Sequence, residues 1–364
     1  MQIREITSFL ENYAPLGSQA SYDNCGLLVG DPGAEVQGVL VCLDCTEEVL
    51  EEAIELGANL IIAHHPIIFK GLKKLNGKNY VERTVIKAIK NDLAIYAIHT
   101  NLDHSVKGVN AEIARRLGIE NPSILLPNEG VLSKLAVFVP RDHAGTVEKA
   151  MFAAGAGVIG NYAECSFESE GIGAFRPLEG ADPFEGRVGA RTRTEEVKLE
   201  VLVSNHILSK VVHAMLDAHP YEEVAHDIIP LQNANQEEGS GMIGALKDPM
   251  DALTFLAKLK QTFHCGVIRH TELTGKKIRS VAFCGGAGSF LLPHAVRRKA
   301  DIYITGDYKY HEFFDADGQI IIADIGHYES EQFTTNLIVE VLTKNFAKFA
   351  VHNTGVNTNP INYF

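Results

Sequence analysis

Long aliphatic runs alternate with amphipathic stretches in the first third and in the last quarter of the chain. The runs consist mainly of Val, Ile, Leu and Ala, and the stretches between them repeat apolar residues three and four positions apart. The first pattern predicts buried strands and the second predicts the helices that cover them. The first zone predicts strands at 36–44, 58–65 and 93–100 and helices at 46–56, 81–91 and 109–118. The last zone predicts strands at 278–286, 300–307 and 319–326 and helices at 289–299, 309–316 and 330–346. Together they indicate one α/β unit, a mostly parallel sheet with helices on both faces.

The pattern changes between these zones. It predicts, in order, a strand at 132–140, a helix at 143–155, strands at 162–171 and 197–205, a helix at 208–219 and a strand at 222–231. This β-α-β-β-α-β order is that of a ferredoxin-like α+β domain. The flanking segments GIENPSILLPNEG and QNANQEEGSG are rich in polar and turn-forming residues, which indicates linkers. The predicted domains are therefore an α/β domain formed by residues 1–125 and 236–364, and an insert at 126–235.

Composition and charge exclude several classes of protein. The net charge of −13 and the lack of clustered Lys and Arg argue against a nucleic-acid partner. The N-terminal residues repeat at helical spacing and lack the apolar core of a secretory signal, and no window approaches the roughly 18 apolar residues of a membrane helix. We therefore expect a cytoplasmic protein with no membrane partner. The six cysteines are too scattered for a disulfide framework, and the pair in CLDC, Cys42 and Cys45, is typical of buried apolar positions more than of a redox or zinc pair.

Histidines and carboxylates follow the predicted strands at their carboxyl ends. This edge of an open α/β sheet is where ligands bind. The residues there are His64, His65, His99, Asp103, Asp307, His311, His327 and Glu331. A single histidine after a strand is usually an ordinary polar residue, but several at one edge favour a metal site. Imidazole and carboxylate are ligands of zinc, manganese and iron alike.

Five of these residues form the predicted ligand set: His64, His65, Asp103, His327 and Glu331. A catalytic zinc normally takes three protein ligands, so the same set shared between two ions would leave room for water on each. Neighbouring side chains on an extended chain diverge, and Pro66 keeps His65 extended, so the two imidazoles can reach separate ions. His327 and Glu331 are four residues apart and share one face if a helix begins there.

Other polar residues have two interpretations each. His99, Asp307 and His311 are candidates for acid–base or substrate contacts, and equally for positions behind the metal ligands. Asp23 and Asn24 either orient a histidine or are ordinary turn residues. The stretch CGGAGSF, residues 284–290, is either a phosphate-binding turn or a tight strand-to-helix turn.

The motifs AHHPIIFKG, HTNLD, TGDYKYHE and GHYESE together resemble the Nif-three-like family, whose bacterial members are often named GTP cyclohydrolase 1 type 2 homologues. The resemblance covers nearly the whole chain, including a PII- or CutA-like insert found in the longer members. It implies two divalent ions bridged by Glu331, with His64 and His327 facing one ion and His65 and Asp103 facing the other. It also implies a toroidal homohexamer built from trimers, and conversion of GTP to dihydroneopterin triphosphate with loss of formate.

Two hypotheses of different classes follow. The first is a metal-dependent hydrolase of a nucleotide or related small molecule. The second is a metal-binding regulatory or interaction protein, in which the insert senses a ligand or drives assembly. Ligand candidates that follow strands favour the first, because such loop positions more often serve function than stability.

Overall fold

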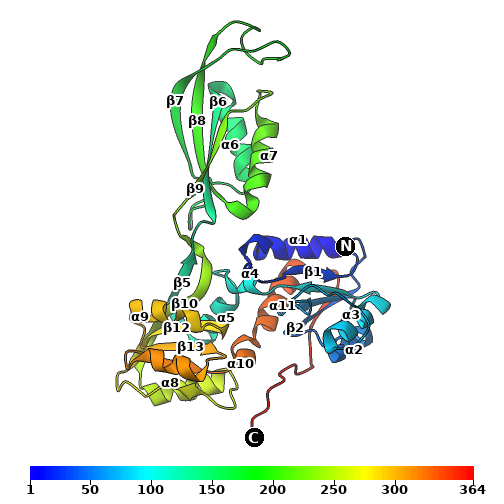
Figure 1. The fold of residues 1–364 in the computed structure, drawn as a ribbon, viewed down its shortest axis with the longest axis vertical. Coiled ribbons are helices and arrows are strands. Elements are labelled where there is room, and N and C mark those ends of the chain that lie inside the picture. The colour runs from blue at the N-terminus through cyan, green and yellow to red at the C-terminus, as the bar shows by residue number, and fades with distance from the viewer. The chain divides into compact units, whose positions relative to one another are not determined.

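A computed structural model describes all residues from Met1 to Phe364 (Figure 1). The chain divides into two compact units. One is discontinuous and contains Met1–Pro127 and Glu237–Phe364, and the other is the insert, Asn128–Gln236. The sequence patterns predicted the insert at residues 126–235. No helix in the structure combines the length and the apolar character that a membrane span requires.

The first sheet of the discontinuous unit joins the N-terminal strands to the last strand of the chain. Its order is β1-β4-β3-β2-β15, in which only the edge strand β1 is antiparallel to its neighbour. The strands are β1 (Gly26–Val29), β2 (Gly38–Cys42), β3 (Leu60–Ala63), β4 (Ala94–Ala97) and β15 (Ala350–Asn353). Alternate residues of β2 enter two different apolar clusters, Val39 and Val41 in one and Leu40 and Cys42 in the other. Both faces of this sheet are therefore covered, as the continuous aliphatic runs predicted.

The second sheet contains the strands from the later part of the chain, in the order β11-β14-β13-β12-β10-β5. Strands β12, β13 and β14 are parallel, whereas β10 runs antiparallel to β12 and β11 runs antiparallel to β14. The strands are β5 (Ile119–Asn128), β10 (Asn235–Met250), β11 (Arg269–His270), β12 (Ile278–Ala287), β13 (Ile302–Gly306) and β14 (Ile321–Asp324). The α/β class is confirmed, but the core is divided between two sheets. Residues from both sheets, such as Tyr96 and Phe283, meet in one apolar cluster.

Both predicted linkers are strands, so that prediction was wrong. GIENPSILLPN coincides with β5, and most of QNANQEEGSG belongs to β10. Their polar residues do not prevent strand formation, because β10 lies between β12 and β5, where neighbouring strands can satisfy its backbone groups. Polar composition alone therefore did not distinguish a linker from a strand at the margin of a sheet.

The helices of the discontinuous unit largely follow the prediction. They are α1 (Ile3–Tyr13), α2 (Glu47–Glu55), α3 (Tyr80–Lys90), α4 (Thr100–Asp103), α5 (Val109–Leu117), α8 (Ala252–Thr262), α9 (Leu292–Arg297), α10 (His327–Glu331) and α11 (Thr334–Asn345). Three short 3-10 helices accompany them, η1 (Leu16–Ser18), η4 (Ser289–Leu291) and η5 (Tyr310–Ala316). The single helix predicted at 330–346 is instead two helices, α10 and α11, that meet near Phe333.

The insert has the predicted ferredoxin-like order of elements. They are β6 (Leu132–Pro140), η2 (Arg141–His143), α6 (Ala144–Ala153), β7 (Ser166–Phe175), β8 (Thr192–Ser204), η3 (Asn205–Ile207), α7 (Leu208–Ala218) and β9 (His226–Leu231). The antiparallel sheet has the order β7-β8-β6-β9, and both helices lie on the same side of it in Figure 1. Val147 and Met151 of α6 and Val211 and Met215 of α7 pack with the strands in a core of their own. The ferredoxin-like prediction for the insert is therefore confirmed.

Candidate metal centre

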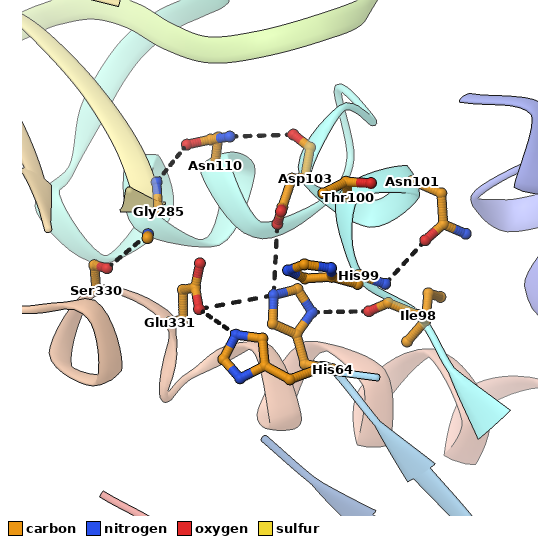
Figure 2. A network of polar contacts seen from close by, with 12 residues as sticks. His64, Ile98, His99, Thr100, Asn101, Asp103, Asn110, Gly285, Ser330 and Glu331 are labelled. Carbon is orange, nitrogen blue, oxygen red and sulfur yellow. Dashed lines mark hydrogen bonds and ion pairs between the residues drawn. The ribbon is translucent and has the colours of Figure 1, made fainter. Parts of the chain in front are cut away.

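The strand ends of the two sheets bring the five predicted ligands into one cluster. His64 and His65 directly follow β3, Asp103 ends α4 just after β4, and His327 and Glu331 are the first and last residues of α10, which follows β14. Figure 2 shows His64, Asp103 and Glu331 pointing toward one another from these separate elements. Glu331 is the common member, because its Oε2 lies within 4 Å of all three histidines.

His64 is fully buried, and one of its two ring nitrogens faces two carboxyl groups. Its Nδ1 is 2.8 Å from the carbonyl oxygen of Ile98, so Nδ1 donates to that oxygen and Nε2 carries the lone pair. Nε2 is 3.6 Å from Asp103 Oδ1 and 3.9 Å from Glu331 Oε2. Burial lowers the pKa of His64 to about 3, so the ring is neutral at physiological pH. Burial also raises the pKa of Asp103 well above its usual range, which favours the protonated carboxyl when no ion is bound. Even so, the 3.6 Å between Nε2 and Oδ1 is too long for a hydrogen bond.

Two of these buried atoms have no hydrogen-bond partner, His64 Nε2 and Asp103 Oδ1. Buried polar atoms are nearly always paired, so each exception needs an explanation. A divalent cation between them would displace any proton from Asp103 and accept an electron pair from both atoms. The donor set of imidazole and carboxylate is one that zinc, manganese and iron accept. The residues present therefore fit a divalent metal ion.

His65 and His327 form a second group around the same Glu331 oxygen. Their Nε2 atoms lie 3.0 and 3.1 Å from Glu331 Oε2 and 3.4 Å from each other. Burial by itself lowers both pKa values, but contacts with carboxylates outweigh it and raise the pKa of His65 to about 10 and that of His327 to about 11. At this separation a proton on one ring disfavours a proton on the other. The two histidines therefore titrate as a coupled pair that holds protons at neutral pH.

The side chains group differently from the pairing that the family resemblance implies, and that pairing of ligands with ions stays a prediction. His64 groups with Asp103 and Glu331, and His65 groups with His327 and Glu331, with the ligand atoms of each group within 4.8 Å of one another. The resemblance had instead implied His64 with His327 and His65 with Asp103. The expected divergence of the two adjacent rings was wrong, because the chain bends at His64 and His65 instead of continuing extended, and the ring centroids lie 4.9 Å apart. His64 points toward Asp103 behind β4, and His65 points toward α10.

An aspartate holds the outer nitrogen of each ring in the second group. His65 Nδ1 lies 2.8 Å from Asp44 Oδ1, and His327 Nδ1 lies 2.9 Å from Asp307 Oδ2. Such contacts fix the tautomer so that Nε2 points at the ion, and they raise the basicity of the ring. Asp307, a candidate for acid–base chemistry, is thus placed as an orienting residue for His327.

His99 approaches the first two histidines from β4. Its ring centroid is 5.3 Å from those of both His64 and His65, and its Nδ1 is 2.9 Å from Asp23 Oδ1. Burial raises the pKa of Asp23, but hydrogen bonds from His99 and Thr100 outweigh this and lower it far below its usual range. Of the two residues Asp23 and Asn24, Asp23 therefore orients a histidine. Asn24 does not, because its side-chain amide donates to the carbonyl oxygen of Ile68 at 2.6 Å.

The glycines in the last residues of β12 hold Glu331 in place rather than forming a phosphate site. The N–H of Gly285 donates to Asn110 Oδ1 and that of Gly286 to Ser330 Oγ, at 3.1 and 2.9 Å (Figure 2). These donors are used within the protein, which supports the tight-turn interpretation of CGGAGSF. Gly286 has φ of +62°, and a Cβ there would lie 2.3 Å from Glu331 Oε1. Only glycine leaves room for this carboxylate.

The family model that describes Duf34/NIF3 (NGG1p interacting factor 3) matches residues 1–360. The chain belongs to the DUF34/NIF3 family. A relative from Halalkalibacterium halodurans, named GTP cyclohydrolase 1 type 2 homolog, is 43% identical over 325 residues, which are 88% of this chain and 87% of the relative. One of the same name from Bacillus subtilis is 38% identical over 99% of this chain and 98% of its own length. The crystal structure of a Bacillus cereus protein related to NIF3 superposes with a TM-score of 0.86 at 39% identity, covering 100% of this chain and 99% of that one.

Sequence reasoning missed one residue of this NIF3-family site, Asp44. Asp44 lies in CLDC, where only the two cysteines were interpreted and the aspartate between them was not. The rule that found the other residues applies here too, since Asp44 follows β2 at the same edge of the sheet. His311 shows the opposite case. It is exposed on η5, where it packs against Tyr310, and it does not line the cavity beside the cluster.

A cavity of about 470 Å³ opens beside the second histidine group. Its walls include the site residues Asp44, His65, His99, Asp307 and His327, together with Leu43, Pro66, Phe69, Tyr328, Asn359, Pro360 and Ile361. The last three belong to the C-terminal segment, residues 354–364, which crosses from the first sheet to α10. Thr358 Oγ1 donates to Asp44 Oδ2 at 2.9 Å, and Tyr363 OH donates to Glu329 Oε1 at 3.4 Å. This segment had no recognisable pattern in the sequence.

Proposed function

We propose that this member of the DUF34/NIF3 family is a metal-dependent hydrolase with two divalent ions, zinc, manganese or iron, that share Glu331. His64 and Asp103 would hold one ion, and His65 and His327 the other. The observation that carries the proposal is the pair of buried, unpartnered atoms, His64 Nε2 and Asp103 Oδ1, that face each other across 3.6 Å. Two of the three groups that could hold an ion share Glu331, whose Oε2 lies within 4 Å of His64, His65 and His327, and this supports two ions rather than one.

Adjacent divalent ions lower the pKa of water and polarise an oxygen of the substrate, which is the chemistry that hydrolysis needs. The residues of the chain position these groups and the substrate. His99 lines the cavity with Nδ1 held by Asp23, so its Nε2 is placed to accept or donate a proton. Phe69 and Tyr328 give the cavity two aromatic walls, which suit a substrate with a flat ring.

The name of the relatives suggests GTP as the substrate, with formate as a product. The lining of the cavity includes no lysine or arginine, so the phosphates of a nucleotide would rely on the ions and the histidines for charge balance. A nucleotide would therefore need both ions to bind, whereas a smaller ring compound with few negative charges would depend on them less. GTP ring opening is the specific form of the proposal that an assay can test directly.

The test combines metal content with turnover. Protein loaded with zinc, manganese or iron should contain two ions per chain by elemental analysis, and formate release from GTP is then measured. His65→Ala should lose both one ion and the activity, whereas His270→Ala, which changes an exposed histidine on β11, should lose neither. Fully loaded protein that releases no formate would rule out GTP, and one that hydrolyses no nucleotide or related compound in a wider screen would rule out the hydrolase.

We also propose the hexamer built from trimers that the family resemblance implies. Light scattering coupled to size-exclusion chromatography should then give six times the mass of one chain. A stable monomer at micromolar concentration would contradict it.

A regulatory role is the second candidate, and a cavity within the insert favours it. Replacing residues 128–236 by a short linker between β5 and β10 separates the two roles. A hydrolase should keep its turnover in the discontinuous unit, whereas a sensor should lose its response to ligand.

A further inference from the structure

A second cavity, of about 390 Å³, lies entirely within the insert. It lies at one end of the sheet. Strands β6, β7 and β8 form part of its wall, and the rest comes from the loop between β7 and β8 and the segment between α7 and β9. Its volume falls in the range of about 300–1,000 Å³ that is usual for small-molecule sites. The lining has two chemical components, aromatic rings and glutamates, which are Phe138, Phe175, Phe184, Tyr221, Glu185, Glu196, Glu222 and Glu223.

Tyr221 is the centre of the aromatic component. Its ring centroid is 6.1 Å from those of Phe175 and Phe184 and 5.0 Å from that of His219, all with tilted or edge contacts. These contacts tie the loop before β8 to the segment after α7. Phe184 is 52% exposed, so much of its ring surface is open to solvent or to a ligand. Aromatic faces attract cations through their quadrupole, most strongly when water is partly excluded.

Two of the glutamates are held in position by hydroxyl groups. Tyr221 OH donates to Glu196 Oε1 at 3.1 Å, and the buried hydroxyl of Thr194 donates to Glu185. Gly173 leaves the space that Glu196 occupies, because a Cβ at that position would lie 2.0 Å from Glu196 Oε2. The two carboxylates are therefore fixed before any ligand arrives, which lowers the entropic cost of binding.

The charge of the lining selects the sign of the ligand. The four glutamates face a single cationic residue, Arg176, so the cavity attracts cations and repels phosphates and carboxylates. A bare metal ion does not fit, because every group of three His, Cys, Asp or Glu residues close enough to share an ion lies at the metal centre and none lies here. The aromatic rings add affinity for a cation that carries carbon.

We infer that the insert binds a small organic cation, an amine with apolar substituents, against Tyr221 and between the carboxylates of Glu185 and Glu196. The apolar part of the amine packs on Phe175 and Phe184, and its charge pairs with the glutamates. This binding needs neither metal nor turnover, so it can be tested independently of the proposed hydrolase.

The experiment is calorimetric titration of the full-length, metal-loaded protein with choline, phenethylammonium and agmatine. At least one of these cations should give saturable binding, and 3,3-dimethyl-1-butanol, the uncharged isostere of choline, should bind at least tenfold more weakly than the cations that bind. Glu196→Gln should weaken cation binding by about tenfold, and Phe184→Ala, which removes a half-exposed ring, by about threefold to tenfold. Glu168→Gln on the exposed part of β7 is the matched control and should change nothing.

Several results would overturn the inference. No saturable binding by any of the three cations would do so, as would an isostere that binds as tightly as choline. Equal affinities of Glu196→Gln, Phe184→Ala and the Glu168→Gln control would place the binding elsewhere. Saturable binding of ATP in preference to the cations would show an anion site. Melting curves of each variant confirm that a loss of binding is not a loss of folding.

Discussion

Removal of the charge on Asp44 tests how the second histidine group is built. Asp44 Oδ1 lies 2.8 Å from His65 Nδ1, and Asp44 Oδ2 accepts from Thr358. In Asp44→Asn the amide can keep its oxygen toward His65 and its nitrogen toward Thr358, whose hydroxyl can accept, so the geometry survives and only the charge is lost. Loss of such a partner typically costs 10–100-fold in metal affinity, about 1.4–2.8 kcal/mol. The side chain of Asp44 is 37% exposed, so solvent screens it and we expect the lower limit, about tenfold.

Asp44→Ala extends the series because it removes the hydrogen bond as well as the charge, so the loss should approach about a hundredfold. Affinities come from competition with a chelating dye. Elemental analysis after dialysis at a buffered free metal concentration, high enough to fill both sites of the wild type but below the weakened dissociation constant of the variant, gives the stoichiometry. The ion held by His64 and Asp103 should remain, so the variants should fall from two ions per chain to one. Asp92→Asn, an exposed aspartate with positive φ that asparagine tolerates, is the control. The reasoning is refuted if Asp44→Ala binds two ions as tightly as the wild type.

Three further predictions concern the same site. The pKa values of His65 and His327 are raised to about 10 and about 11, so a metal ion that binds these rings must displace at least one proton. The apparent metal affinity should therefore rise about tenfold per pH unit between pH 6 and 9 in chelator competition. An affinity independent of pH would contradict this. Gly286→Ala should displace Glu331 and weaken metal binding at both groups by at least about tenfold. The control is Gly57→Ala, which has a similar positive φ but no neighbour within 4 Å, and it should leave binding unchanged in the same titration. His311→Ala should keep wild-type metal content, and a loss of one ion on elemental analysis would mean that η5 belongs to the site.

The strand-end rule succeeded because it depends on topology alone. Parallel strands of one sheet end at the same edge, which places the residues after β3 and β4 together and those after β13 and β14 together. That the two edges face each other depends on the packing of two sheets, which the expectation of a single sheet did not include. The grouping of the ligands was beyond its reach. Whether His64 lies beside Asp103 or beside His327 depends on the packing of side chains within the cluster, and no periodic pattern records that packing.

The same distinction separates the parts of the fold that were predicted from those that were not. Continuous aliphatic strands and amphipathic helices carry local signals, and the insert was predicted from them element by element. Strands β5 and β10 gain their backbone hydrogen bonds from partners far along the chain, and their polar residues concealed them. The return of β15 to the first sheet likewise depends on long-range pairing with β2.

The C-terminal segment has a practical consequence for anyone who prepares this protein. Asn359, Pro360 and Ile361 line the cavity, and Tyr363 contacts the helix that carries His327 and Glu331. A purification tag fused after Phe364 would therefore begin two residues after Tyr363, which contacts the helix of the proposed ligands, and a histidine tag would bring competing imidazoles to the same place. Measurements of metal content and turnover are best made with the tag at the N-terminus or removed.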